Sequence, residues 1–369
     1  MFLAGVAEGL WLNLHTLYLE FLGARPEQIG SALGIANVMV IFAYVPAGVL
    51  ADRGRRKLII ITAWAITVLA MLGLAAAPDW RWAVPGFTLY LLASFSRPAF
   101  SAQIVASTIG GNPSRDFAIT SISFSVGALL SPVAGGWIGE GWGLRMVYLV
   151  SAVAYFFSML CLTPLRETAS HRPRAVLPIR QLIGNREFMW QIAVVMLITF
   201  SIYLGVTLAP LYIENIKGLR LDELGQLGSV SAVGMLALTV WLASRPALQR
   251  RGLIITQGTV LAALALFLVA PGGVSSILVA AALLRGGADA IWTPISGRLS
   301  AWLPPEALAL GFAFRDTAMR ISLTTAPVVA GLLYAVDPTW PLIAGMAALC
   351  VTIALTLTLP RAISPGATP

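Results

Sequence analysis

Residues 131–136 read Ser-Pro-Val-Ala-Gly-Gly, and residues 326–331 read Ala-Pro-Val-Val-Ala-Gly, 195 positions later. An offset of 194 or 195 positions also separates three further pairs of similar segments: Leu17-Tyr18-Leu19-Glu20 and Leu211-Tyr212-Ile213-Glu214, Gly30-Ser31-Ala32-Leu33-Gly34 and Gly225-Gln226-Leu227-Gly228, Leu58-Ile59-Ile60 and Leu253-Ile254-Ile255. The chain is therefore predicted to consist of two similar halves. In a membrane, such halves form a site that can be exposed to either side in turn, which is typical of transporters.

Composition places the chain in a lipid bilayer. Apolar residues make up 58% of it and charged residues 11%, and the mean hydropathy is +0.84. In soluble globular domains, about a quarter of all residues are charged. No segments alternate with the period of barrel strands, so we expect an all-α membrane protein. The net charge of +8 fits membrane topology better than nucleic-acid binding, and no nucleic-acid partner is expected.

A membrane-spanning helix needs about 20 apolar residues. Dividing the chain at its polar and Pro/Gly clusters gives twelve candidate spans: 1–22, 29–51, 57–77, 83–106, 116–138, 143–164, 187–212, 222–244, 252–270, 274–297, 306–334 and 339–360. The first is read as a span and not as a cleaved signal peptide. We predict an N-terminal six-helix bundle, a cytoplasmic linker and a C-terminal six-helix bundle with a short cytoplasmic tail, at residues 1–164, 165–186 and 187–369.

The positions of Lys and Arg predict the orientation. With a cytoplasmic N-terminus, the inner connections carry fifteen of these residues, Arg298 among them, and the outer connections carry five. Cytoplasmic loops of membrane proteins are enriched in Lys and Arg. Both termini are therefore expected in the cytoplasm.

The chain lacks the sequence patterns of ATP-driven transport and of catalysis. It has no nucleotide-binding loop of the G-x-x-x-x-G-K-[ST] type, no metal-ligand spacing and no Ser-His arrangement, and its two cysteines suggest no disulfide framework. We expect no catalytic residue, no metal and no cofactor. A membrane-embedded enzyme, receptor or sensor is the less favoured alternative to a transporter.

The connection between spans two and three is Gly48-Val49-Leu50-Ala51-Asp52-Arg53-Gly54-Arg55-Arg56-Lys57. Together with the repeat and the twelve spans, it resembles the loop signature G-x-x-x-D-R-x-G-R-R/K of the major facilitator superfamily. Arg55 stands where that signature has its second glycine. The resemblance implies two pseudo-symmetric six-helix bundles, and it gives Gly48, Asp52, Arg53 and Arg56 a role in locking the outward-facing state.

The segment Gly127-Ala128-Leu129-Leu130-Ser131-Pro132-Val133-Ala134-Gly135-Gly136 in span five looks like the family's G-x-x-x-G-P-x-x-G-G element, which is associated with exporting antiporters. Ser131 replaces one of its glycines. Pro132, Gly135 and Gly136 are therefore assigned to gating. Close helix packing is the alternative, because proline bends a helix and small residues let a neighbouring helix approach.

Charged residues inside spans mark cavities or partners, since each costs about 2.5–3.5 kcal/mol at the bilayer centre on insertion scales. Glu8 in span one and Arg97 in span four are predicted at similar depths, slightly to the cytoplasmic side of the midplane. The resemblance implies that spans one, four, seven and ten line the cavity. Glu8 and Arg97 could therefore meet, and Glu8 is either a proton carrier or a fixed partner of Arg97.

Spans ten and eleven each carry a charged pair at helical spacing, Arg285 with Asp289 and Asp316 with Arg320. Residues four apart share one helix face, so a cluster of four charges is plausible. It is either a network that holds the second half together, the interpretation we favour for Asp316 and Arg320, or part of a substrate site.

Proton coupling requires a carboxyl group that gains and loses a proton, and burial in apolar surroundings favours the protonated form. Glu8 and Asp289 are the candidates. Asp289 should stay ionised beside Arg285, which makes Glu8 the better one. Substrate contacts are expected from Arg97, Arg285 and polar or aromatic residues of the spans that line the cavity: Trp11, Asn13, Gln103, Gln191, Tyr203 and Trp292.

These observations predict a secondary active transporter of small organic molecules in the cytoplasmic (inner) membrane, working by alternating access as a proton antiporter for efflux. Its partners would be the small-molecule substrate, the proton and the lipid bilayer, and we expect a monomer. Uptake or exchange of an organic anion, held by Arg97 and Arg285, is the alternative within transport.

Overall fold

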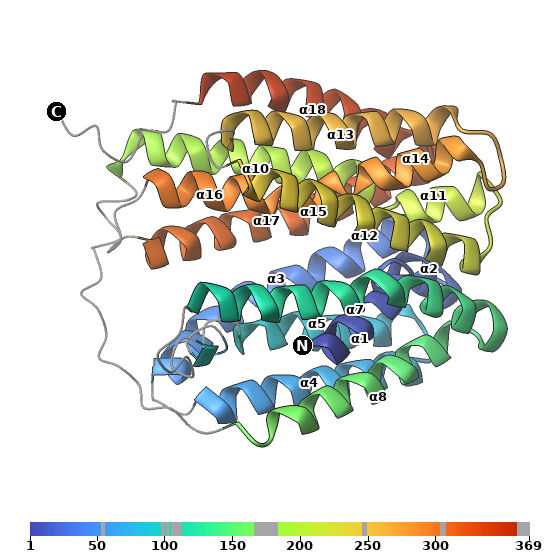
Figure 1. The fold of residues 1–369 in the computed structure, drawn as a ribbon. Coiled ribbons are helices and arrows are strands. Elements are labelled where there is room, and N and C mark those ends of the chain that lie inside the picture. Colours follow the sequence, from blue (N-terminus) through green and yellow to red (C-terminus); the bar gives the residue numbers. More distant parts are fainter. Residues whose placement is uncertain are drawn as a thin grey trace. The chain divides into compact units, whose positions relative to one another are not determined.

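The computed structural model describes residues 1–52, 56–96, 100, 103–104, 113–165, 184–245, 249–302 and 308–359. Every regular element in these ranges is a helix, and Figure 1 shows long helices throughout the described chain. The prediction of an all-α protein is confirmed for this part of the molecule.

Nine helical segments among the described residues are long and apolar enough to cross a membrane. They are Lys57–Ala76, Ile119–Trp142, Leu144–Leu162, Arg186–Asn215, Leu221–Ala243, Arg251–Val269, Ser276–Ser296, Phe314–Val336 and Trp340–Thr358. Each coincides with one of the twelve predicted spans. Of the other three predicted spans, 29–51 lies within one continuous helix, Pro26–Asp52, whose side chains from residue 41 on are outside the described part. The span 1–22 is broken after Leu12, and 83–106 runs into residues outside the described ranges.

Residue contacts divide the chain into two compact units. The first is Met1–Arg172 with Leu219–Ser229, and the second is Pro173–Gly218 with Val230–Pro369. The main division falls inside the predicted linker. The difference from the predicted halves is the segment Leu219–Ser229, which comes from the second half of the sequence and packs in the first unit.

The first unit is built from α1 (Phe2–Leu12), α2 (His15–Phe21), α3 (Pro26–Asp52), α4 (Arg56–Ala76), α5 (Trp80–Leu92), the 3-10 helix η1 (Ala93–Ser96), α7 (Pro113–Trp142), α8 (Leu144–Leu162) and the start of α12 (Leu221–Ala243). Within it, α1 packs against α7 and α8, and α4 packs against α5 and α8. Figure 1 shows α4 and α8 running side by side along most of their length.

Glycines let α1 and α7 approach closely. A Cβ atom on Gly5 would collide with the backbone of α7 at Phe124, and one on Gly135 would collide with the backbone of α1 at Leu10. Gly127 faces the backbone at Phe2 in the same way. Because the glycines come from both helices, backbone meets backbone along this pair, as is typical of small-residue packing between membrane helices.

The start of α12 is held against the end of α7 in the first unit. A Cβ atom on Gly225 would collide with the backbone of α7 at Pro132 and Gly136. Beyond this contact, Arg220 Nε lies 3.2 Å from Glu140 Oε1, and the backbone N–H of Leu221 donates to Glu140 Oε2 at 3.3 Å. Close packing and an exposed ion pair therefore join these two helix ends.

The second unit contains α10 (Arg186–Val206), α11 (Ala209–Asn215), the rest of α12, α13 (Gln249–Val269), α14 (Ser276–Arg285), α15 (Gly287–Ala290), α16 (Trp292–Trp302), α17 (Leu308–Val336) and α18 (Trp340–Thr358). Here α10 packs against α17 and α18, and α13 packs against α14 and α18. Buried Gln257 of α13 bonds to Thr352 and Thr356 of α18 at 2.8 and 3.0 Å. This polar contact ties two otherwise apolar helices together.

The predicted span 274–297 is not one uninterrupted helix. It divides into α14, α15 and part of α16, with breaks at Gly286 and Ile291. A Cβ atom on Gly286 would collide with the backbone of α12 at Met235 and Ser231. The chain therefore departs from a regular helix at a close contact with α12, next to Arg285.

Candidate functional site

Polar and charged side chains of the second unit gather around Tyr203 of α10. Arg285, Asp289 and Arg320 all act electrostatically on its hydroxyl group. Arg285 also acts on Asp289, and its Nη1 donates to Ser231 Oγ of α12 at 3.1 Å. Tyr203, Arg285 and Arg320 are half-buried, whereas Asp289 is exposed between the buried Ala288 and Ala290. The cluster can therefore meet both a polar ligand and water.

The fourth member of the predicted charge cluster has another partner. Exposed Asp316 accepts two hydrogen bonds at Oδ1 from the guanidinium group of its neighbour Arg315, at 2.9 and 2.6 Å. Arg315 also donates to Ser296 Oγ of α16 at 2.9 Å. The structure thus brings Arg285, Asp289 and Arg320 together around Tyr203, while Asp316 bonds to Arg315, which joins α17 to α16.

Glu8 lies beside an aromatic cluster in the first unit. Its half-buried carboxylate acts electrostatically on the buried hydroxyl group of Tyr155, as does Tyr90. The Trp11 ring packs edge-on against Tyr90 at 4.8 Å between ring centroids and lies 5.9 Å from both Phe87 and Tyr148. The rings named here come from three helices, α1, α5 and α8.

His15, close to this cluster, caps the end of α1. Its Nδ1 lies 2.5 Å from the carbonyl oxygen of Leu12, and its ring stands edge-on to Trp11 at 6.4 Å. The last carbonyl groups of a helix have no partner within the helix, so a side-chain donor stabilises them. This contact fits the break between α1 and α2.

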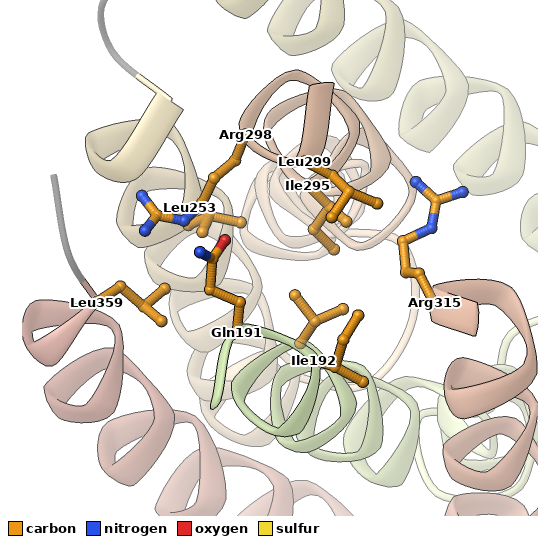
Figure 2. Close-up of a pocket in the computed structure, with 9 residues that line it drawn as sticks. Gln191, Ile192, Leu253, Ile295, Arg298, Leu299, Arg315 and Leu359 are labelled. Carbon is orange, nitrogen blue, oxygen red and sulfur yellow. The ribbon is translucent and has the colours of Figure 1, made fainter. Parts of the chain in front are cut away.

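The remaining candidates differ in burial and in their contacts. Asn13 packs against Gly228 of α12, with its Nδ2 only 2.7 Å from where a Cβ atom would stand. Gln103 is buried, and Trp292 is half-buried at the start of α16. Gln191 lines a pocket in the second unit, shown in Figure 2.

The gating candidates in α7 lie at close helix contacts, and their gating role stays a prediction. Gly135 faces the backbone of α1 and Gly136 faces the start of α12, while Pro132 lies inside the helix and touches both Gly225 and Gly228. Gly48, Asp52 and Arg56 lie in helical backbone whose side chains are outside the described part, and Arg53 and Arg97 are outside it entirely. Their roles stay predictions.

Sequence reasoning missed the aromatic partners of Trp11 and the nature of Arg298. Tyr148 and Tyr155 are seven residues apart in α8, a spacing that places both on one helix face and was available as a signal. Arg298 is predicted in an inner connection, and it follows the candidate span Ser276–Ser296. It nevertheless lies within α16 and is only 3% exposed, a burial that the sequence pattern did not indicate.

A chain with repeated halves, helices as its only described regular elements, nine described spans and charged groups within them has the architecture of a secondary membrane transporter. The chain belongs to the Major Facilitator Superfamily, because that family's model matches residues 1–295. It is therefore an integral, multi-pass membrane protein of a transport family.

Two relatives are named Multidrug resistance protein MdtG. The one from Klebsiella pneumoniae (strain 342) is 31% identical over 168 residues, which cover 43% of this chain and 40% of the relative. The one from Escherichia coli O1:K1 / APEC is 29% identical over 173 residues, covering 44% and 42%. The matched region spans less than half of each relative.

Solved structures share the fold over almost the whole chain. A mutant of the nucleoside transporter NupG has a TM-score of 0.77 at 14% identity, covering 97% of this chain and 95% of NupG. A bacterial homologue of the human lysosomal transporter Spinster, in an inward-facing and occupied conformation, has a TM-score of 0.76 at 14% identity, with 98% and 95% covered. At this identity the likeness concerns the fold alone.

Proposed function

We propose that this protein exports small organic molecules across the cytoplasmic membrane in exchange for protons, by alternating access and with both termini in the cytoplasm. The observation that carries the proposal is the position of Glu8, a half-buried carboxylate in a predicted span, next to Trp11 and the buried hydroxyl group of Tyr155. The relatives named Multidrug resistance protein support export as the direction.

In this proposal, Glu8 carries the proton. A carboxylate among aromatic rings loses hydration, so its protonation responds strongly to whether water or substrate is next to it. Tyr90 is half-buried and lies at the same cluster, and aromatic faces bind flat organic molecules and cations. Substrate and proton would then compete for one region of the first unit, which is what coupled exchange requires.

The test is transport by purified protein in proteoliposomes with an imposed pH gradient and ethidium as the fluorescent probe. Wild-type protein should accumulate ethidium against its gradient. Glu8→Gln should reduce this accumulation to background while ethidium still binds, and the binding should no longer depend on pH between 5 and 9. Glu27→Gln is the matched control, because Glu27 lies in the first turn of α3, outside the predicted span, and should leave transport unchanged.

One result would overturn the assignment of the proton. If Glu8→Gln protein still concentrates ethidium when only a proton gradient is supplied, another group carries the proton.

Exchange of an organic anion is the second candidate. It is favoured by Arg285, a half-buried guanidinium group beside Tyr203 on a broken span. Arg285 already has Ser231 as an acceptor and Asp289 as a counter-charge, and for this reason we rank it second. If the substrate is an anion, Arg97→Gln and Arg285→Gln should each abolish its binding in calorimetry. An organic cation should still bind to at least one of the two variants.

A further inference from the structure

The first predicted span of each half is broken at the same place in the repeat. In the first unit, α1 ends at Leu12 and α2 begins at His15. In the second unit, α10 ends at Val206 and α11 begins at Ala209. Each boundary in the second unit lies 194 positions after its counterpart, which is the offset of the sequence repeat. The two breaks therefore correspond to each other.

The two breaks also share one backbone conformation. Leu14, the residue before α2, has φ −106° and ψ −1°, and Leu208, the residue before α11, has φ −100° and ψ 9°. An α-helix has a ψ of about −42°. The backbone N–H of Leu14 donates to the carbonyl group of Trp11, three residues earlier, at 2.9 Å. The repeat thus preserves the interruption of the helix as well as the apolar length of the span.

In the second unit, a proline fixes the break. Pro210 has no backbone N–H, and in a continuous helix its ring would collide with the carbonyl group four residues earlier, that of Val206. Val206 is the last residue of α10. Pro210 lies instead in the first turn of α11, where a helix does not need the missing N–H. For this reason α10 and α11 cannot join into one helix.

In the first unit, a hydrogen bond takes the place of the proline. Thr16 stands at the position that corresponds to Pro210, and residues 1–25 contain no proline. In a continuous helix, the N–H of Thr16 would donate to the carbonyl group of Leu12. In the structure, His15 Nδ1 lies 2.5 Å from that carbonyl oxygen, which can only accept a hydrogen bond. The His15 ring and a continuous helix therefore compete for one acceptor.

The two sides of this break are anchored to different helices. The glycine contacts described above, such as that of Gly135, hold α1 against α7. On the other side of the break, the hydroxyl group of Tyr18 donates to the carbonyl group of Leu74 near the end of α4. The N–H of Trp80, at the start of α5, donates to the carbonyl group of Leu22 at 3.3 Å. A change at the break would therefore move α2 and these helix ends relative to α1 and α7.

We propose that the break between α1 and α2 is a switchable hinge, whereas the break between α10 and α11 is permanent. The hinge closes when the Thr16 N–H replaces His15 at the Leu12 carbonyl group, so that α1 and α2 form one helix. Glu8 and Trp11 lie in the last two turns of α1, directly before the hinge. Its effect on transport rests on the proposed function, whereas the hinge itself does not.

Thr16→Pro locks the hinge open by copying the second unit. The buried hydroxyl group of Thr16 makes no hydrogen bond to another described residue, so its loss should be tolerated. The variant should melt at or above the wild-type temperature, because a proline in a compatible conformation restricts the unfolded chain. In proteoliposomes its accumulation of ethidium should fall to background, while ethidium still binds. Thr16→Ala is the matched control and should transport, because it keeps the backbone N–H.

A distance measurement detects the hinge without transport. Both native cysteines are replaced by serine, and nitroxide labels are attached to Phe21→Cys on α2 and Leu130→Cys on α7, whose native side chains are exposed. Pulsed electron paramagnetic resonance should then give two populations of the distance between the labels. Thr16→Pro should keep only one of them. His15→Ala, which removes the competing donor, should enrich the other one, and it serves as the test if Thr16→Pro does not fold.

Labels in the second unit provide the control for the distance measurement. Asn215→Cys on α11 and Ile321→Cys on α17 should give a single population, because Pro210 keeps that break open. Two populations in this pair would refute the permanent break.

The outcomes separate the hinge from the proposed function. One and the same distance distribution in the background protein, Thr16→Pro and His15→Ala would overturn the hinge. The expected distances together with wild-type transport by Thr16→Pro would refute its role in transport. The expected distances in a protein that does not transport ethidium at all would confirm the hinge and contradict the proposed function instead.

Discussion

A single carboxylate organises the turn between the last two helices. Asp337 follows α17, and its Oδ1 accepts hydrogen bonds from the backbone N–H of Thr339 at 2.8 Å and from the Thr339 hydroxyl group at 2.6 Å. Both bonds favour the charged carboxylate, so they lower the pKa of Asp337 from its ordinary value. The residue lies between the spans Phe314–Val336 and Trp340–Thr358, where water can reach it.

This contact predicts a pH-dependent stability. Because the pKa of the folded state is the lower one, the stabilisation is complete above the pKa of the unfolded chain and is lost as the pH falls through the folded-state value. Asp337→Ala should melt at a lower temperature than wild type at pH 7, and the difference should shrink as the pH is lowered to 3. Fluorescence-monitored melting of the detergent-solubilised protein measures it. A difference that stays constant over this range would contradict the prediction.

At the scale of elements, the contact between α1 and α7 depends on glycine. Gly135 of α7 stands against the backbone at Leu10, whereas Gly141 near the end of the same helix has open space around the position of a Cβ atom. The span-five motif that is associated with exporting antiporters is therefore also the packing surface between these two helices. Glu8 lies on α1, so this contact also fixes the helix that carries the proposed proton site.

A matched pair of substitutions separates packing from helix propensity. Alanine is favoured over glycine in a helix by about 1 kcal/mol, and this gain applies at both positions. Gly135→Ala must also displace backbone, and overpacking typically costs about 1–3 kcal/mol. We expect Gly135→Ala to melt below wild type and Gly141→Ala to melt at or above it. Equal melting temperatures for the two variants would show that α1 and α7 can separate without loss.

Sequence reasoning succeeded where one physical constraint dominates. The length and apolarity that a bilayer demands locate the nine described spans, such as 57–77 and 143–164, without any knowledge of packing. Sequence reasoning failed where a contact between residues or helices determines the local structure or the bonding partner. The break at Gly286 lies at a close contact with α12, and Asp316 bonds to its neighbour Arg315 although helical spacing favours Arg320. Neither choice can be derived from periodicity.

At the scale of the whole molecule, the orientation in the membrane remains a prediction from the charge bias, and labelling can test it. Cys161 and Cys350 are free and exposed, so both are first replaced by serine. In that background, Arg81→Cys should react with a membrane-impermeant maleimide in intact cells. Ser170→Cys, in the central linker, should react only after the membrane is opened. Labelling of Ser170→Cys in intact cells would reverse the topology.

The docking of Leu219–Ser229 in the first unit has a consequence for biosynthesis. Chains are made from the N-terminus at about 5–20 residues per second, so α7 has been synthesised before α12 begins to leave the ribosome. Gly225 can then settle against Gly136, and Arg220 against Glu140, while most of the second unit is still unmade. The helices that follow α12 would thus be added to a chain whose α12 is already held against α7. The order of synthesis would in this way guide the assembly of the second unit.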